Sequence, residues 1–147
     1  GNFSKTGIIN NNLFNELNEL SFYFEKHPKS LGIEFVLEEI FPIIDKYKLS
    51  EIDILATYIK HAAFQISKNI LDNEKVLISG GGSFNKTLIK SLTNYGINIS
   101  RPNDIIINYK ESLIFALLGH LRLNNEINCL KSVTGATRDH SSGDIFS

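Results

Sequence analysis

The stretch at residues 75–85, Lys-Val-Leu-Ile-Ser-Gly-Gly-Gly-Ser-Phe-Asn, carries the residues whose types and spacing favour chemistry. Its apolar run at residues 76–78 predicts a short strand buried on both faces, and a helix is predicted over residues 87–92. The glycines between them can adopt positive φ without a steric penalty and let a ligand approach the backbone N–H groups. With the N-terminal end of the following helix, this turn is suited to a phosphate or to the polar edge of a nucleotide.

Two standard phosphate-binding motifs do not fit this turn. A Walker loop needs Gly-Lys-Ser/Thr after the glycines, and a dinucleotide fingerprint begun at Gly80 needs a glycine where Asn85 stands. A tight strand-to-helix turn without any ligand is therefore an open alternative to a nucleotide site.

Composition restricts the class of protein. The chain has 147 residues, 42% of them hydrophobic, which is enough for one domain with a core. A formal net charge of -1 provides no basic field, so we expect neither nucleic acid nor a membrane as partner. The single cysteine, Cys129, excludes an intrachain disulfide framework and is expected to be a buried structural thiol. Residues 1–20 lack a signal-peptide pattern and no stretch approaches 18 apolar residues, so we expect a cytoplasmic protein.

Residues 1–9 show no helix start and are expected to be a loop or the end of a strand. An amphipathic helix is then predicted from residue 12 to the His27-Pro28 pair, capped by one of residues 10–12. Its apolar stripe consists of Leu13, Leu17, Leu20 and Phe24.

A second helix is predicted over residues 31–46. Ser30 is its expected cap, and Pro42 is expected to kink or restart it because proline lacks a backbone donor. The longest helix is predicted over residues 51–70, opened by a capping box at Ser50. No second ligand stands at metal spacing from His61, so we expect the histidines to be packed or surface side chains: His27, His61, His120 and His140.

Beyond the glycine turn, residues 97–100 and 105–107 are predicted to be short β-type runs. A helix is then predicted over residues 109–123, capped by Asn108, and its apolar character on most sides predicts that it is buried. A polar and mobile tail is expected to follow. The fold class is therefore α/β with helix in excess, a short mixed sheet flanked by long helices.

Four ordered motifs resemble those of the anhydro-N-acetylmuramic acid kinase family, and together they span nearly the whole chain. They are Pro28-Lys29-Ser30-x-Gly32-x-Glu34, Leu77-x-Ser79-Gly80-Gly81-Gly82-x-x-Asn85, Lys110-Glu111-x-x-x-Phe115-Ala116 and Ser132-Val133-Thr134-Gly135-Ala136. The resemblance implies the C-terminal lobe of a two-lobed, actin-like (ribonuclease H-like) ATPase fold, here a single domain at residues 1–147. It also implies ATP with Mg²⁺ as cofactors and a small sugar as substrate, and it leaves a homodimer open.

The activity that the resemblance implies is an ATP-dependent opening of the 1,6-anhydro ring of the sugar by water, with phosphorylation of O6, in peptidoglycan recycling. ATP-binding residues are implied at Gly80, Gly81, Gly82 and Asn85, and a sugar-binding carboxylate at Glu111. No catalytic or metal-binding residue is implied in this chain, because the general-base aspartate of the family is expected upstream of Gly1.

Residues 27–34 depart from the family pattern, since His27, Leu31 and Ile33 replace a proline, a threonine and an arginine. We therefore expect this segment to serve packing at the lobe hinge, and Lys29 and Ser30 are weaker candidates for ligand contacts than the glycine turn. Two hypotheses follow for the chain. It is either the C-terminal lobe of the sugar kinase, catalytically incomplete alone, or a non-catalytic nucleotide-binding or interaction domain derived from the same fold.

Overall fold

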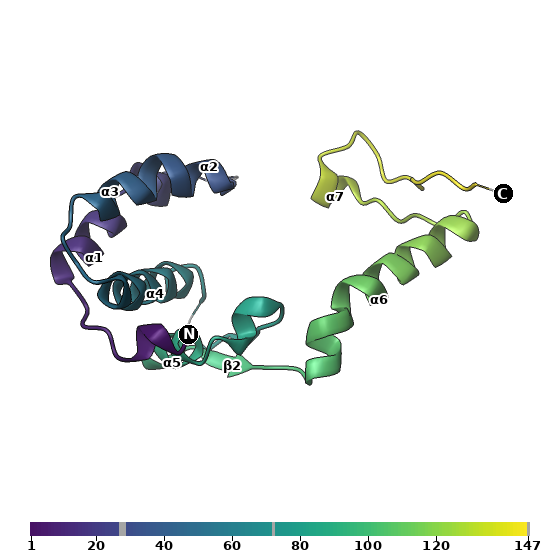
Figure 1. Cartoon of the computed structure of the whole chain (residues 1–147). Helices are drawn as coiled ribbons and strands as arrows, with labels where there is room; N and C mark the ends of the chain where they lie inside the picture. Colours follow the sequence, from purple (N-terminus) through teal and green to yellow (C-terminus); the bar gives the residue numbers. More distant parts are fainter. Residues whose placement is uncertain (27–28, 72, 147) are drawn as a thin grey trace. The chain divides into compact units, whose positions relative to one another are not determined.

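A computed structural model describes residues 1–26, 29–71 and 73–146 (Figure 1). The chain divides into two compact units, Gly1–Arg101 and Pro102–Ser147. No described helix is long and apolar enough to cross a membrane.

The first unit contains most of the helices and both described strands. In chain order its elements are η1 (Phe3–Lys5), α1 (Asn11–Asn18), η2 (Ser21–Phe24), α2 (Ile33–Phe35), η3 (Val36–Ile40), α3 (Phe41–Asp45), α4 (Glu51–Ser67), β1 (Lys75–Leu77), η4 (Gly81–Phe84), α5 (Lys86–Asn94) and β2 (Asn98–Ser100). The second unit contains α6 (Asp104–Leu123) and α7 (Lys131–Thr134). The label η marks a 3₁₀ helix, except that η3 is a π-helical segment. The short 3₁₀ helix η1 lies in the opening stretch that was predicted to be a loop or a strand end.

The sheet consists of β1 and β2, which pair in parallel with Val76 opposite Ile99. The helix-rich α/β class is therefore confirmed, but the described sheet is parallel rather than mixed. The prediction that the first strand is buried on both faces is wrong, because the side chain of Leu77 is 66% exposed. Each strand of a two-stranded sheet has only one neighbouring strand, so β1 is an edge strand and is less enclosed than a central strand would be.

Helix α1 begins as its sequence predicts but ends early. The side chain of Asn10 accepts a hydrogen bond from the N–H of Leu13, and Leu13 and Leu17 are fully buried. The helix ends at Asn18 and a 3₁₀ turn follows, so the helical stripe does not continue and Phe24 is 71% exposed. The expected stop at His27-Pro28 lies outside the described residues.

The segment from α2 through η3 to α3 is continuous, with a π-helical turn before Pro42. In place of the predicted kink or restart, the helix accommodates Pro42 through this π-helical turn, since proline cannot donate a helical hydrogen bond. The predicted cap is wrong, because Gly32 rather than Ser30 holds the N-cap position.

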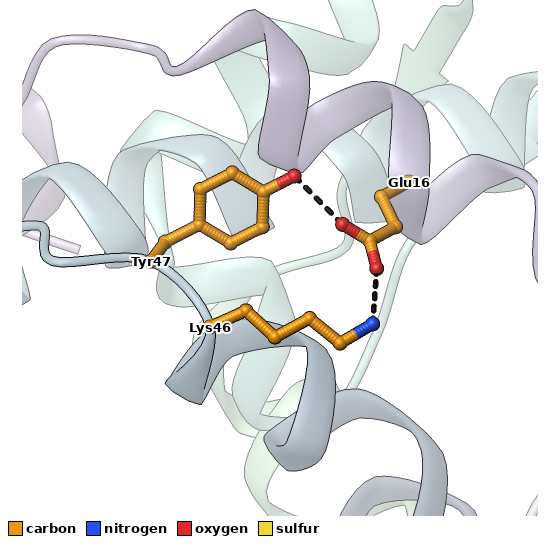
Figure 2. Close-up of polar contacts among 3 residues, drawn as sticks. All are labelled: Glu16, Lys46 and Tyr47. Atoms are coloured by element: carbon orange, nitrogen blue, oxygen red, sulfur yellow. Dashed lines mark hydrogen bonds and ion pairs between the residues drawn. The ribbon is translucent and has the colours of Figure 1, made fainter.

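A residue of α1 and the two residues that follow α3 form a polar cluster where these two helices meet (Figure 2). Glu16 accepts from the Lys46 ammonium at 2.5 Å and from the Tyr47 hydroxyl at 2.7 Å. The Lys46 hydrogen bond, followed by that of Tyr47, lowers the pKa of the Glu16 carboxyl. These bonds tie α1 to the end of α3 over the core cluster of Leu13, Leu17, Ile40 and Ile43.

Ser50 caps α4 as predicted, because its side chain accepts from the N–H of Asp53, but the capping box is incomplete, since the Asp53 carboxylate accepts from the Ser50 hydroxyl and the Ile8 N–H. The helix ends at Ser67, three residues before the predicted end. The helix contacts η1, α1 and α5, and its buried residues are Ala56, Thr57, His61 and Ala63. It therefore lies at the centre of the first unit, between the N-terminal helices and the layer that carries the glycine turn (Figure 1).

In the second unit, α6 begins at Asp104 and is capped by Asn103, whose side chain accepts from the N–H of Ile106 at 2.9 Å. The predicted strand at residues 105–107 and the predicted cap at Asn108 are therefore wrong. An N-cap asparagine and an acidic first turn favour a helix over the β preference of three isoleucines. The predicted burial is also wrong for most of the helix, since Leu113 and Phe115 are 62% and 70% exposed.

The tail is held by hydrogen bonds over part of its length. Cys129 and His140 form an isolated antiparallel bridge, and the Arg122 side chain donates to the Gly143 carbonyl at 2.7 Å. The thiol of Cys129 is half-buried rather than buried. Helix α7 ends at Thr134, and Gly135 follows as its C-cap with a left-handed φ of 72°.

Candidate functional site

The glycine turn connects β1 to α5 through the short helix η4. Gly80 has φ 80° and ψ 179°, a conformation accessible essentially to glycine alone. Gly81 and Gly82 form the start of η4 and do not have positive φ. Of the three glycines, only Gly80 therefore uses the positive φ that glycine permits.

The outer side of the turn is open. A Cβ atom built on Gly80, Gly81 or Gly82 meets nothing within 4 Å. The inner side is held by Ser83, which is buried and whose backbone N–H and hydroxyl both donate to the Gly80 carbonyl, at 3.0 and 2.7 Å. As the first residues of a 3₁₀ helix, Gly81 and Gly82 have no intrahelical acceptor for their N–H groups. The turn therefore presents backbone to an unobstructed space.

Asn85 caps α5, since its side-chain oxygen accepts from the N–H of Leu88 at 3.2 Å. Sequence reasoning expected the glycines to lead directly into this helix, with the helix N–H groups left for a ligand. Instead η4 intervenes and Asn85 occupies one of those N–H groups. If Asn85 contacts a ligand, its side-chain amide nitrogen therefore makes that contact.

A hollow of about 430 Å³ adjoins the turn, lined by Ser83, Phe84, Lys86, Ile89, Lys90 and Arg101. Phe84 is 46% exposed, and the Arg101 guanidinium lies 4.8 Å from the centre of its ring. A flat aromatic face next to three cationic side chains suits a planar base and an anionic group. Sequence reasoning missed these residues, although the spacing of Lys86 and Lys90 places them on one face of the helix.

Glu111 lies in the third turn of α6 and is exposed. Because α6 begins at Asp104, Glu111 lies inside the helix rather than in its first turn. Glu111 belongs to the second unit and the glycine turn to the first.

The expectation that the segment of Lys29 serves packing is supported by its contacts. The Lys29 ammonium donates to the Phe22 carbonyl at 2.7 Å and lies 4.8 Å from the centre of the Phe22 ring. Both contacts hold the chain locally beside η2. Ser30 is exposed.

His61 is confirmed as a packed histidine, with 2% of its surface exposed. His120 is exposed, the backbone of His140 forms the bridge to Cys129, and His27 lies outside the described residues. Within residues 1–26, 29–71 and 73–146, no group of three or more His, Cys, Asp or Glu side chains is arranged to hold a metal ion.

Comparison with known proteins decides the family. The family model described as anhydro-N-acetylmuramic acid kinase matches residues 1–147, the whole of the chain. The chain belongs to this family. The resemblance to this family is therefore confirmed.

Curated relatives carry the same name. An anhydro-N-acetylmuramic acid kinase of Francisella tularensis subsp. novicida is 33% identical over 150 residues, covering 92% of this chain and 39% of the relative. Those of Hydrogenovibrio crunogenus and Crocosphaera subtropica are each 30% identical, covering 99% of this chain and 42% of the relative. The chain thus spans about two fifths of the length of the curated relatives it matches.

Proposed function

We propose that this chain is part of an ATP-dependent kinase that opens the 1,6-anhydro ring of anhydro-N-acetylmuramic acid and phosphorylates O6, in peptidoglycan recycling. The observation that carries the proposal is the match of all 147 residues to the anhydro-N-acetylmuramic acid kinase family. A relative of that name aligns with 99% of this chain, a region that includes the glycine turn and α6.

Within such a kinase, we assign this chain to the C-terminal lobe of an actin-like fold. The helix-rich α/β architecture and the short parallel sheet are compatible with that assignment. No catalytic base and no ligand of Mg²⁺ is assigned to these residues. The chain's own contribution is to bind and orient ATP and the sugar.

We assign the nucleoside part of ATP to the glycine turn, with contacts from Gly80, Gly81, Gly82 and Asn85. The turn fits such a group because its outer side is free of side-chain atoms and Gly80 keeps the backbone in a conformation that other residues avoid. The neighbouring ring of Phe84 offers a stacking surface for the base. ATP, when bound with Mg²⁺, supplies the phosphoryl group that is transferred.

We assign Glu111 to the sugar. A carboxylate accepts hydrogen bonds from sugar hydroxyls, and its charge stabilises positive charge that develops nearby. The exposure of Glu111 leaves its side chain accessible to a ligand.

The nucleotide assignment is tested with Gly81→Val in the complete protein, with Thr93→Val as the matched control. Gly81 lacks positive φ, so valine there adds a branched side chain to the open space while straining the backbone little. Thr93 is an exposed residue of α5 outside the turn.

We expect Gly81→Val to weaken the affinity for a non-hydrolysable ATP analogue by about tenfold or more, as measured by calorimetry. Its melting temperature and the affinity of Thr93→Val should stay close to those of the parent. Unchanged affinity in a folded Gly81→Val variant would mean that the turn is only structural. Sugar-dependent ADP release by the parent protein separates the kinase from a non-catalytic binding domain.

A further inference from the structure

A second pocket in the first unit shares Lys86 and Lys90 with the hollow beside the glycine turn, but the rest of its lining is not explained by the proposed function. It has a volume of about 580 Å³ and lies between η1, α4 and the side of α5. Four lysines line it, one from η1, one from α4 and two from α5: Lys5, Lys60, Lys86 and Lys90. We call it the lysine pocket.

The charge in the lysine pocket is of one sign. None of the described residues that line it is Asp or Glu, although the chain has 16 acidic residues against 15 Lys and Arg. The nearly balanced composition of the chain therefore does not account for the absence of acidic side chains from the described lining of the pocket. Lys86 and Lys90 stand four residues apart on α5, a spacing at which like charges repel each other. A concave surface lined by one sign of charge concentrates ions of the opposite sign.

The walls of the pocket are fixed by contacts in the structure. The Ser4 hydroxyl and the Thr87 hydroxyl both donate to the Gly1 carbonyl, at 2.9 and 2.8 Å, which ties η1 to α5. Binding an anion here would therefore require little ordering of η1 against α5. The ammonium of Lys60 lies 4.5 Å from the centre of the Phe14 ring, which is not part of the lining, so it leaves that contact to reach a bound anion.

We propose that the lysine pocket binds a small multivalent phosphate compound, a phosphate monoester or a pyrophosphate. Its volume falls within the range of small-molecule sites, about 300–1,000 Å³. Lysine ammonium groups bind phosphate as point charges, and four of them attract an anion of two or more charges far better than a single carboxylate. Hydroxyl and amide side chains in the lining, among them Ser91 and Asn94, supply further hydrogen-bond donors.

The test titrates the complete protein with inorganic pyrophosphate in one arm and glucose 6-phosphate in the other, by calorimetry. The variant Lys5→Gln/Lys60→Gln removes two charges from the pocket walls that lie away from the glycine turn. The matched control Lys26→Gln/Lys48→Gln removes two exposed charges elsewhere. If the double variant does not fold, Lys5→Glu, at an exposed residue, replaces it in the test.

We expect saturable binding in at least one arm, weakened by salt and reduced about tenfold or more in the pocket variant while the control retains it. The arm that binds more tightly identifies whether an organic or an inorganic phosphate is the ligand. Absence of saturable binding in both arms, or equal weakening in both double variants, would overturn the proposal.

ATP-analogue affinity, measured in the same variants, separates this site from the nucleotide site. It should be unchanged in Lys5→Gln/Lys60→Gln. Parallel loss of ATP-analogue and pyrophosphate affinity would show that the lysine pocket belongs to the nucleotide site and would overturn a separate site. Failure of Gly81→Val to affect ATP-analogue binding bears only on the proposed function.

Discussion

The Tyr23 hydroxyl lies 2.9 Å from Nε2 of His61, and this contact joins η2 to the middle of α4. On the other side of the ring, Nδ1 lies 2.8 Å from the side-chain oxygen of Asn18, whose amide nitrogen donates to the Phe14 carbonyl. That oxygen only accepts, so Nδ1 of His61 carries the hydrogen and Nε2 accepts from Tyr23. The network is therefore complete with a neutral imidazole.

His61 makes the stability of the protein depend on pH. Burial lowers the pKa of His61 from 6.5 to about 4, and burial also raises the pKa of Tyr23 to about 12. Because the folded pKa of His61 is the lower one, the unfolded chain binds more protons between the two values, and stability falls as pH falls from about 6.5 toward about 4. We expect the free energy of unfolding to drop by about 2 kcal/mol between pH 7 and pH 5 from this residue.

Urea denaturation at several pH values measures this dependence, with His61→Gln and the exposed His120→Gln as a matched pair. Glutamine does not titrate, so the His61→Gln variant should lose the part of the pH slope above pH 5. The His120→Gln variant should keep it. Equal slopes in the parent and in His61→Gln would show that His61 does not titrate abnormally.

The two neighbouring glycines of the turn should respond differently to alanine. Gly80→Ala places a Cβ on a residue with φ 80°, so we expect a loss of stability of about 1–3 kcal/mol from backbone strain alone. Gly81→Ala has neither positive φ nor a steric contact within 4 Å, so its stability should stay the same or rise slightly. Chemical denaturation of both variants measures the difference, and equal stabilities would contradict the positive φ of Gly80.

The sequence predicted best where local chemistry alone decides the structure. The caps at Asn10 and Ser50 depend on hydrogen bonds within a few residues, and the structure confirms them. The start of α6 was missed because three isoleucines resemble a strand until the preceding Asn103 is recognised as a cap. Periodicity alone also did not reveal that His61 takes a buried place on α4, since its partners Asn18 and Tyr23 lie about forty residues away in the sequence.

The candidate site was predicted only in part for the same reason. The glycines are consecutive in the sequence and were recognised as a turn, whereas the capping role of Asn85 appears only in the structure. The hollow beside them brings Arg101 against Phe84, and this pairing depends on the parallel register of β1 and β2. Register between strands is a tertiary property that a single sequence does not display.

The cap of α6 is tested by substituting each asparagine near its start. Asn103→Ala removes the side-chain acceptor for the N–H of Ile106 and should destabilise the protein by about 1 kcal/mol. Asn108→Ala lies inside the helix, where alanine has the better helix propensity, so stability should not fall. Thermal denaturation compares the two variants. A larger loss of stability in Asn108→Ala would instead support a helix that begins after Asn108.

Glu111→Gln separates a role in sugar binding from a role in folding. Glu111 is exposed in the third turn of α6 and caps nothing, so a neutral isostere should leave the melting temperature unchanged. If its carboxylate orients the sugar or stabilises charge, sugar-dependent turnover by the complete protein should fall by about 10²-fold or more while ATP-analogue affinity is retained. Glu126→Gln, an exposed acidic residue after α6, is the matched control for the lost charge and should retain turnover. Normal turnover in Glu111→Gln would remove this residue from the sugar site and leave α6 without an assigned role in binding the sugar.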